Sequence, residues 1–182
     1  MKQYLYILIG FTLASCAILP PMNEKLDWTV SDGFTLESSR GTGHRGVRGD
    51  YGHEYLYSRE SEAIEDWTEV AVSREIDIGM TNFSSMSWNP ESVMNSIKNN
   101  YKKNQCSTDT WTILNQDENS ILFEGDVLNC QDYGSQHLIT RIVLGKWYGW
   151  EIHYGIRNKV LTDDERAKFV DNLMSAKVQI VE

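Results

Sequence analysis

The 182-residue chain contains little proline, cysteine or histidine, and it lacks an apolar run long enough for a membrane-spanning helix. Only three prolines and three cysteines occur. A spanning helix needs about 20 apolar residues, whereas the apolar run near the N-terminus covers residues 4–13. Hydrophobic residues make up 41% of the chain and charged residues 24%, which excludes wholesale disorder and a polytopic membrane protein. The length fits one domain of roughly 100–200 residues.

The residue patterns of common catalytic and metal sites are also missing. The four histidines show neither H-x-H nor H-x₃-H spacing, which argues against a metal site; they are His44, His53, His137 and His153. No Gly-x-Ser-x-Gly sequence occurs, so the nucleophile turn of a serine hydrolase is not expected. The sequence therefore predicts no catalytic residue, no metal and no cofactor.

The first sixteen residues have the pattern of a secretory signal. Lys2 precedes the apolar run, and Leu13-Ala14-Ser15-Cys16 follows it. This tetrapeptide resembles the lipobox of bacterial lipoproteins, in which the cysteine is acylated and becomes the first mature residue. The alternative is an ordinary signal peptide cut near Ala17. Lipoproteins of another sorting class have Asp directly after the cysteine. This chain has Ala17 there, as do lipoproteins that are sent to the outer membrane, and the resemblance implies the same destination.

The lipobox resemblance implies a division of the chain and a location. Residues 1–15 are expected to be the signal peptide, 16–27 a lipidated tether, and 28–182 a single domain. Cys16 is the expected site of lipid attachment, and palmitate is among the expected acyl groups. The protein is then expected in the cell envelope, anchored to the outer membrane and facing either the periplasm or the cell surface.

The charge of the mature chain limits its partners. Without residues 1–15 the chain has 16 basic and 26 acidic side chains, a net charge of −10. Such a chain is repelled by phosphate backbones and by anionic lipid. Nucleic acid is therefore not an expected partner, and membrane contact is expected through the acyl anchor alone. An envelope protein or a cell-wall component is the expected partner.

Because acylation is expected to use Cys16, two cysteines remain in the domain. Cys106 and Cys130 lie symmetrically about Glu118, which is the centre of the polar loop 116–120. An unbulged antiparallel hairpin places the two cysteines opposite each other. Since disulfides persist outside the cytosol, we predict a Cys106–Cys130 bridge that serves stability rather than redox chemistry.

Hydrophobic periodicity predicts an α+β domain. Alternating patterns indicate strands over residues 28–38, 54–58, 67–76, 136–144, 148–156 and 178–181, with two further strands in the hairpin. Asn89 and Pro90 begin a helix over about 90–103, and the capping box of Thr162 and Glu165 begins another over about 163–177. We expect an antiparallel sheet with both helices packed on one face.

A glycine-rich and basic segment stands out in this acidic chain. Glycines occupy positions 41, 43, 46, 49 and 52, and they alternate with Arg40, Arg45 and Arg48. Because a strand-like stretch and not a helix follows, the segment does not match a dinucleotide-binding fingerprint. A hairpin loop is the plain interpretation. The alternative is binding of a small anion or a partner through backbone N–H groups and the arginines.

A second set of candidate residues lies on the last two strands before the final helix. Arg141, Glu151 and His153 are expected on the wetter face, opposite the aromatic residues of 148–154. They form either the active site of a hydrolase-like envelope enzyme or a solvated cross-strand charge pairing. Trp67 is interpreted as a core anchor, with a ligand platform as the alternative.

Several elements within residues 54–178 occur in a fixed order: Tyr55 and Tyr57, the Glu-x-Trp-Thr-Glu motif at 65–69, Cys106, Cys130, Ile139 to Ile142, Tyr148 to Arg157, and the helix from Thr162. In this order they resemble a family of bacterial envelope proteins that has no established activity. The order of elements is similar to the PsbP/Mog1-type domain, which implies a binding or assembly module. A lipid-anchored binding module is therefore the expected function.

Overall fold

The computed structural model describes residues 24–41, 53–60, 62, 66–77, 90–130, 134–145 and 148–180. In chain order the elements are β1 (Glu24–Asp27), β2 (Phe34–Gly41), β3 (His53–Arg59), β4 (Glu69–Asp77), α1 (Pro90–Lys103), β5 (Ser107–Gln116), β6 (Ser120–Cys130), β7 (Gly134–Leu144), β8 (Tyr148–Ile156), α2 (Asp163–Ser175) and β9 (Lys177–Ile180). Neither helix within these ranges is long and apolar enough to cross a membrane.

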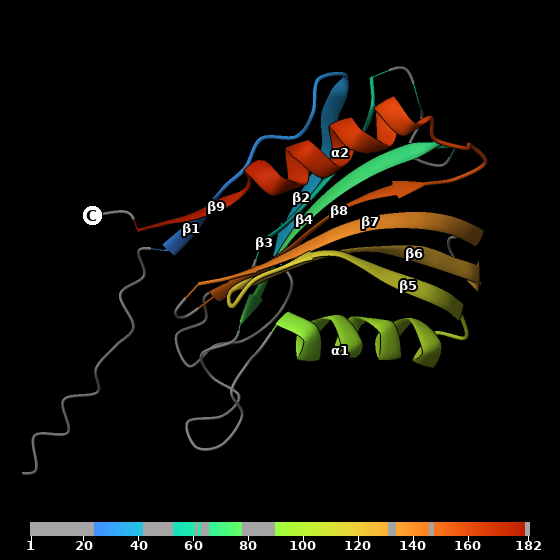
Figure 1. Cartoon of the computed structure of the whole chain (residues 1–182). Coiled ribbons are helices and arrows are strands. Elements are labelled where there is room, and N and C mark those ends of the chain that lie inside the picture. Colours follow the sequence, from blue (N-terminus) through green and yellow to red (C-terminus); the bar gives the residue numbers. More distant parts are fainter. Residues whose placement is uncertain are drawn as a thin grey trace, which may run out of the picture.

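One large antiparallel sheet forms the centre of the molecule (Figure 1). Its strand order is β2-β3-β4-β8-β7-β6-β5, and β1 pairs with β9 in a separate two-stranded sheet. Every neighbouring pair is antiparallel. The α+β class predicted from the sequence is therefore confirmed.

The two helices cover opposite faces of this sheet (Figure 1). Val93 and Met94 of α1 pack in one core cluster with Phe123. Phe169 and Leu173 of α2 pack in another, on the other side of the same strands. The expectation that both helices share one face is wrong. Strands β6 and β7 have apolar residues on both sides, as in a sheet covered by two layers, so each helix packs on its own apolar surface.

The N-terminal part of the fold differs most from the sequence prediction. Residues up to 27 were expected to be tether, yet Glu24–Asp27 form β1 and pair with β9. The first strand of the large sheet begins at Phe34 instead of residue 28. The pairing of β1 with β9 joins segments about 150 positions apart, and no local residue pattern encodes such a contact. The terminal strand itself was predicted correctly.

The start of α2 is built as the sequence predicts. Thr162 Oγ1 accepts a hydrogen bond from the Glu165 backbone N–H at 3.2 Å, and the Glu165 carboxylate accepts one from the Thr162 backbone N–H at 2.9 Å. Hydrogen bonds from Lys159 and Thr162 lower the pKa of Glu165 to about 2. The capping box is confirmed, and its carboxylate stays ionised at neutral pH.

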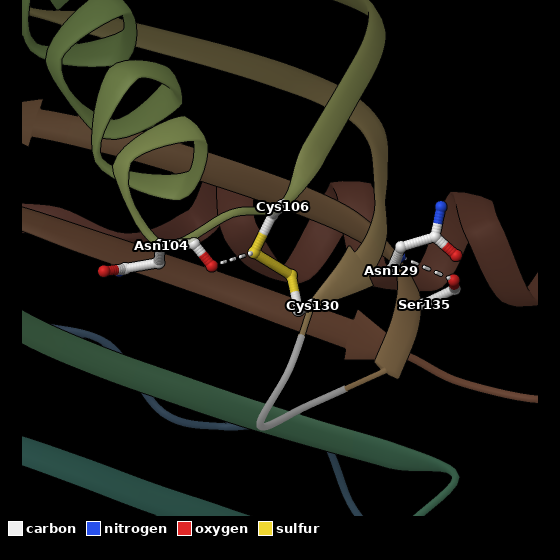
Figure 2. The surroundings of a disulfide bond; sticks show 5 residues. All are labelled: Asn104, Cys106, Asn129, Cys130 and Ser135. Carbon is white, nitrogen blue, oxygen red and sulfur yellow. Dashed lines mark hydrogen bonds between the residues drawn. A yellow bond between two sulfur atoms is a disulfide. The ribbon is translucent and has the colours of Figure 1, made fainter.

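The predicted disulfide between Cys106 and Cys130 is present (Figure 2). Cys106 follows α1 and lies one residue before β5, and its backbone N–H donates to the Tyr101 carbonyl at 3.1 Å. Cys130 is the last residue of β6. Both cysteines are buried in a small cluster with Val127 and Leu138. The bridge therefore ties the end of α1 to the far end of the hairpin.

The hairpin is not the unbulged ladder that the cysteine symmetry predicts. Two irregularities interrupt the pairing of β5 with β6, one between Thr108 and Trp111 and one between Ile113 and Asn115. Asn129 has a positive φ of 57°, and Cys130 pairs with Gly134 of β7. The bridge thus forms at the edge of the hairpin, where the chain leaves the regular register.

Loss of the disulfide is expected to reduce stability. The bridge closes a loop across 24 positions, for which the chain-entropy model gives about 3 kcal/mol. The double variant Cys106→Ser/Cys130→Ser is expected to lose about this much free energy of unfolding, measured by urea denaturation. Reduced wild type is the matched control and should equal the variant. Equal stability of the oxidised and reduced wild type would contradict this role.

Candidate functional site

A row of charged side chains crosses three strands on the α1 side of the sheet. Glu54 of β3 pairs in register with Arg74 of β4, and Arg74 pairs with Glu151 of β8. Arg74 Nε lies 2.7 Å from a Glu54 carboxylate oxygen, and its Nη1 lies 3.6 Å from Glu151. His153 Nδ1 lies 3.2 Å from the other Glu151 oxygen. We call these four residues the charged cluster.

The charged cluster is largely buried, and Arg74 lies between its two carboxylates. Glu151 and His153 are only 4% and 8% exposed, whereas the Arg74 side chain is 41% exposed. Burial raises the pKa of Glu151, but the hydrogen bond with His153 and the charges of His153 and Arg74 outweigh it and lower this pKa overall. Burial likewise opposes the charge of Arg74, yet Glu151 and Glu54 raise its pKa. Glu151 is therefore an ionised, oriented carboxylate.

His153 is the member of the cluster with a free ring nitrogen. Glu151 faces its Nδ1, while Nε2 has no hydrogen-bond partner within the described part of the chain. A carboxylate that holds one imidazole nitrogen leaves the other available to accept a proton. Glu151 and His153 therefore have the geometry of an oriented base.

Arg141 does not belong to this cluster, although it was predicted to share a face with Glu151 and His153. It pairs with Ile152, so it lies on the α2 side of the sheet. Its Nη1 donates to the carbonyl oxygens of Leu173, Met174 and Ala176 at 2.8, 2.8 and 3.1 Å. The last turn of α2 contains no basic residue, so Arg141 supplies the cation that a helix C-terminus favours.

The expectation of a wet face on β8 is also wrong. Every residue of β8 after Tyr148 is buried. The face that holds Glu151 and His153 is polar but covered, and its charges are paired instead of solvated.

The remaining predicted site residues divide into two groups. Arg45 and Arg48 lie outside the described residues, as does Cys16. Arg40 lies in β2, where its backbone pairs with Glu54, but its side chain is not among those described. Anion or partner binding by the glycine- and arginine-rich segment stays a prediction.

Trp67 lies beneath an arginine. Trp67 is 8% exposed, and the Arg157 guanidinium carbon lies 4.4 Å from the centroid of its ring. Arg157 Nε also donates to the Trp67 carbonyl at 3.0 Å. The ring face is thus occupied by a cation from this chain, which favours the anchoring role over a ligand platform.

A groove that the sequence did not predict lies between α2 and the connector from β1 to β2, which run side by side in Figure 1. Its volume is about 860 Å³, within the range of roughly 300–1,000 Å³ common for small-molecule sites. The connector side contributes Trp28, Thr29 and Asp32, and the helix side contributes Lys168 and Asn172. We call this feature the α2 groove.

Asn172 holds the connector in place along the α2 groove. Its side-chain oxygen accepts hydrogen bonds from Trp28 Nε1 at 2.9 Å and from the Tyr154 hydroxyl at 2.7 Å. Its amide nitrogen donates to the Thr29 carbonyl at 2.9 Å. The Ser31 backbone N–H donates to the Tyr154 hydroxyl at 3.0 Å. The walls of the groove are thus fixed before any ligand arrives.

Sequence reasoning missed the α2 groove because its two sides are more than 130 positions apart. Residues 28–38 were assigned to a strand, so no connector was expected beside the last helix. Asn172 lies on the helix between core positions Phe169 and Leu173 and had no recognisable motif. Only the packing of α2 on the sheet brings these groups together.

Within the residues that the structure describes, no group of three or more His, Cys, Asp or Glu side chains is placed to hold a metal ion. Comparison with protein-family models, curated proteins and solved structures found no match.

The structural role of Arg141 gives a direct test. In Arg141→Met, three carbonyl oxygens at the end of α2 lose their charged donor, so the free energy of unfolding should fall by about 2–3 kcal/mol. Urea denaturation followed by circular dichroism measures the change. Arg166→Met is the control, because Arg166 forms a partly exposed ion pair with Glu124 and should cost less than about 1 kcal/mol. Equal losses in the two variants would refute the capping role.

Proposed function

We propose that the chain is a lipid-anchored protein of the cell envelope, most consistent with the outer membrane, whose α+β domain binds an envelope protein or a cell-wall component. The Cys106–Cys130 disulfide is the observation that supports this proposal most. Disulfides persist in exported proteins and are rare in the cytosol. The bridge therefore agrees with export of the chain, as the signal-like residues 1–15 imply, and with acylation of Cys16.

The finer fold assignment is part of the same proposal. An antiparallel sheet flanked by two helices supports a PsbP/Mog1-like assignment, and this domain type is used mainly for binding and assembly. This argument rests on fold-level analogy, so the binding function needs its own site and its own test.

Lipid attachment at Cys16 can be measured in cells. Labelled palmitate is expected to enter the wild-type protein and to be absent from Cys16→Ala, because acylation requires the thiol. The variant Cys106→Ala/Cys130→Ala is the matched control and should keep the label, since its cysteines lie in the folded domain. Label that persists in Cys16→Ala would exclude the anchor.

A second candidate function is hydrolysis of an envelope substrate, and the Glu151–His153 pair favours it. Its buried, ionised carboxylate faces the imidazole at 3.2 Å, the arrangement of an oriented general base. Arg74 and Glu54 replace Arg141 as the neighbouring charged groups.

Complementation of a deletion strain distinguishes the two candidates. If the pair is catalytic, His153→Gln and Glu151→Gln should fail to restore the wild-type phenotype while accumulating to normal levels. His137→Gln serves as the control, because His137 lies on the other face and pairs with Asp126. Full rescue by the His153 and Glu151 variants would exclude the hydrolase.

A further inference from the structure

The α2 groove has unpaired polar groups along its rim. Thr29, Asp32 and Lys168 are exposed. Their side chains have no hydrogen-bond or ion-pair partner among the described residues. They provide a hydroxyl, a carboxylate and an ammonium group, and so both donors and acceptors. The rim can thus hydrogen-bond a ligand without breaking a bond of the fold.

The charges around the α2 groove argue against an anionic ligand. The two free rim charges, Asp32 and Lys168, are of opposite sign. Two further charged residues of the lining are already paired within the protein, since Arg59 contacts Glu69 and Glu165 contacts Lys159. Asp27, the remaining charged residue of the lining, accepts a hydrogen bond from the neutral Gln179 side chain. The lining therefore has one acidic charge in excess, which disfavours an anionic ligand. A ligand with many uncharged hydrogen-bonding groups fits this lining best.

Trp28 adds an aromatic surface to the polar lining. Its indole N–H is bonded to Asn172, and its ring meets the rings of Tyr57 and Tyr154 at interplanar angles of 83° and 67°, each with a centroid distance of 6.3 Å. The ring therefore has one orientation in the groove. A rigid, amphipathic aromatic group provides contact area at little cost in conformational entropy.

We propose that the α2 groove binds a neutral oligosaccharide, with a sugar ring against Trp28 and sugar hydroxyls bonded to Thr29, Asp32 and Lys168. Sugars combine apolar ring faces with closely spaced hydroxyl groups, which matches an aromatic wall beside mixed donors and acceptors. This inference names the ligand class for the binding function proposed above and rests on that function. In the envelope, both cell-wall glycan and the sugar part of surface polysaccharide have this chemistry.

Titration with defined oligosaccharides tests the proposal. The full mature protein is titrated with chitotetraose, cellotetraose and maltotetraose by calorimetry, and with each sugar the indole N–H resonance of Trp28 is followed by NMR, assigned with Trp28→Phe. Saturable binding of at least one probe with a Kd below about 1 mM is expected, together with a shift of that resonance. Preference for chitotetraose indicates cell-wall glycan, and preference for either glucan indicates surface polysaccharide.

Exposed groove variants separate the site from the fold. Thr29→Val and Lys168→Ala each remove about one hydrogen bond, so each should weaken binding about five- to tenfold. Their thermal stability should stay unchanged. The matched controls are Thr112→Val on the edge strand β5 and Lys102→Ala at the end of α1, both exposed and outside the groove. Both controls should bind as the wild type does.

Two outcomes would overturn the inference. One is failure of all three sugars to bind at millimolar concentration. The other is binding that leaves Trp28 unshifted and falls equally in groove and control variants. Neither outcome affects palmitate labelling at Cys16, so the lipid-anchor proposal is tested independently of the sugar site.

Discussion

Burial of both faces of the central strands is the constraint on which the rest of the structure depends. All residues of β7 from Leu138 onward and of β8 from Gly149 onward are buried, so each face needs its own covering helix. Polar groups on these strands must also find partners, because a buried unpaired charge is costly. Arg141 donates hydrogen bonds to carbonyl oxygens at the end of α2, and Glu151 pairs with His153 and Arg74.

The same two-sided packing places the two candidate sites on opposite sides of the sheet. The charged cluster lies on the α1 side, where ion pairs join its members and His153 Nε2 is left without a partner among the described residues. The α2 groove lies on the other side, where Asn172 fixes the connector but leaves rim groups unpaired. A buried network of ion pairs rigidifies a fold, whereas unpaired exposed groups beside a fixed wall are suited to binding. This difference is why we propose the groove as the binding site.

Much of the fold was predictable because its signals are local. The capping box of Thr162 and Glu165, the helix from Pro90 and the strand from Tyr148 all follow from residues within a few positions of one another. The candidate sites were less predictable. His153 and Glu151 were placed together correctly because they are two positions apart on one strand. Arg74 and Glu54 join them through strand pairings, of which the one between Arg74 and Glu151 spans 77 positions.

The sequence by itself determined the α+β class, the element types and the cysteine pair, since periodicity, capping and cysteine count are properties of the chain alone. The tertiary structure decided which face each helix covers, which side of the sheet Arg141 occupies, and that Trp28 and Asn172 border one groove. The bulges of the hairpin belong to this second group. These features depend on strand register and on contacts between distant segments, and a shift of one residue in register moves a side chain to the other face.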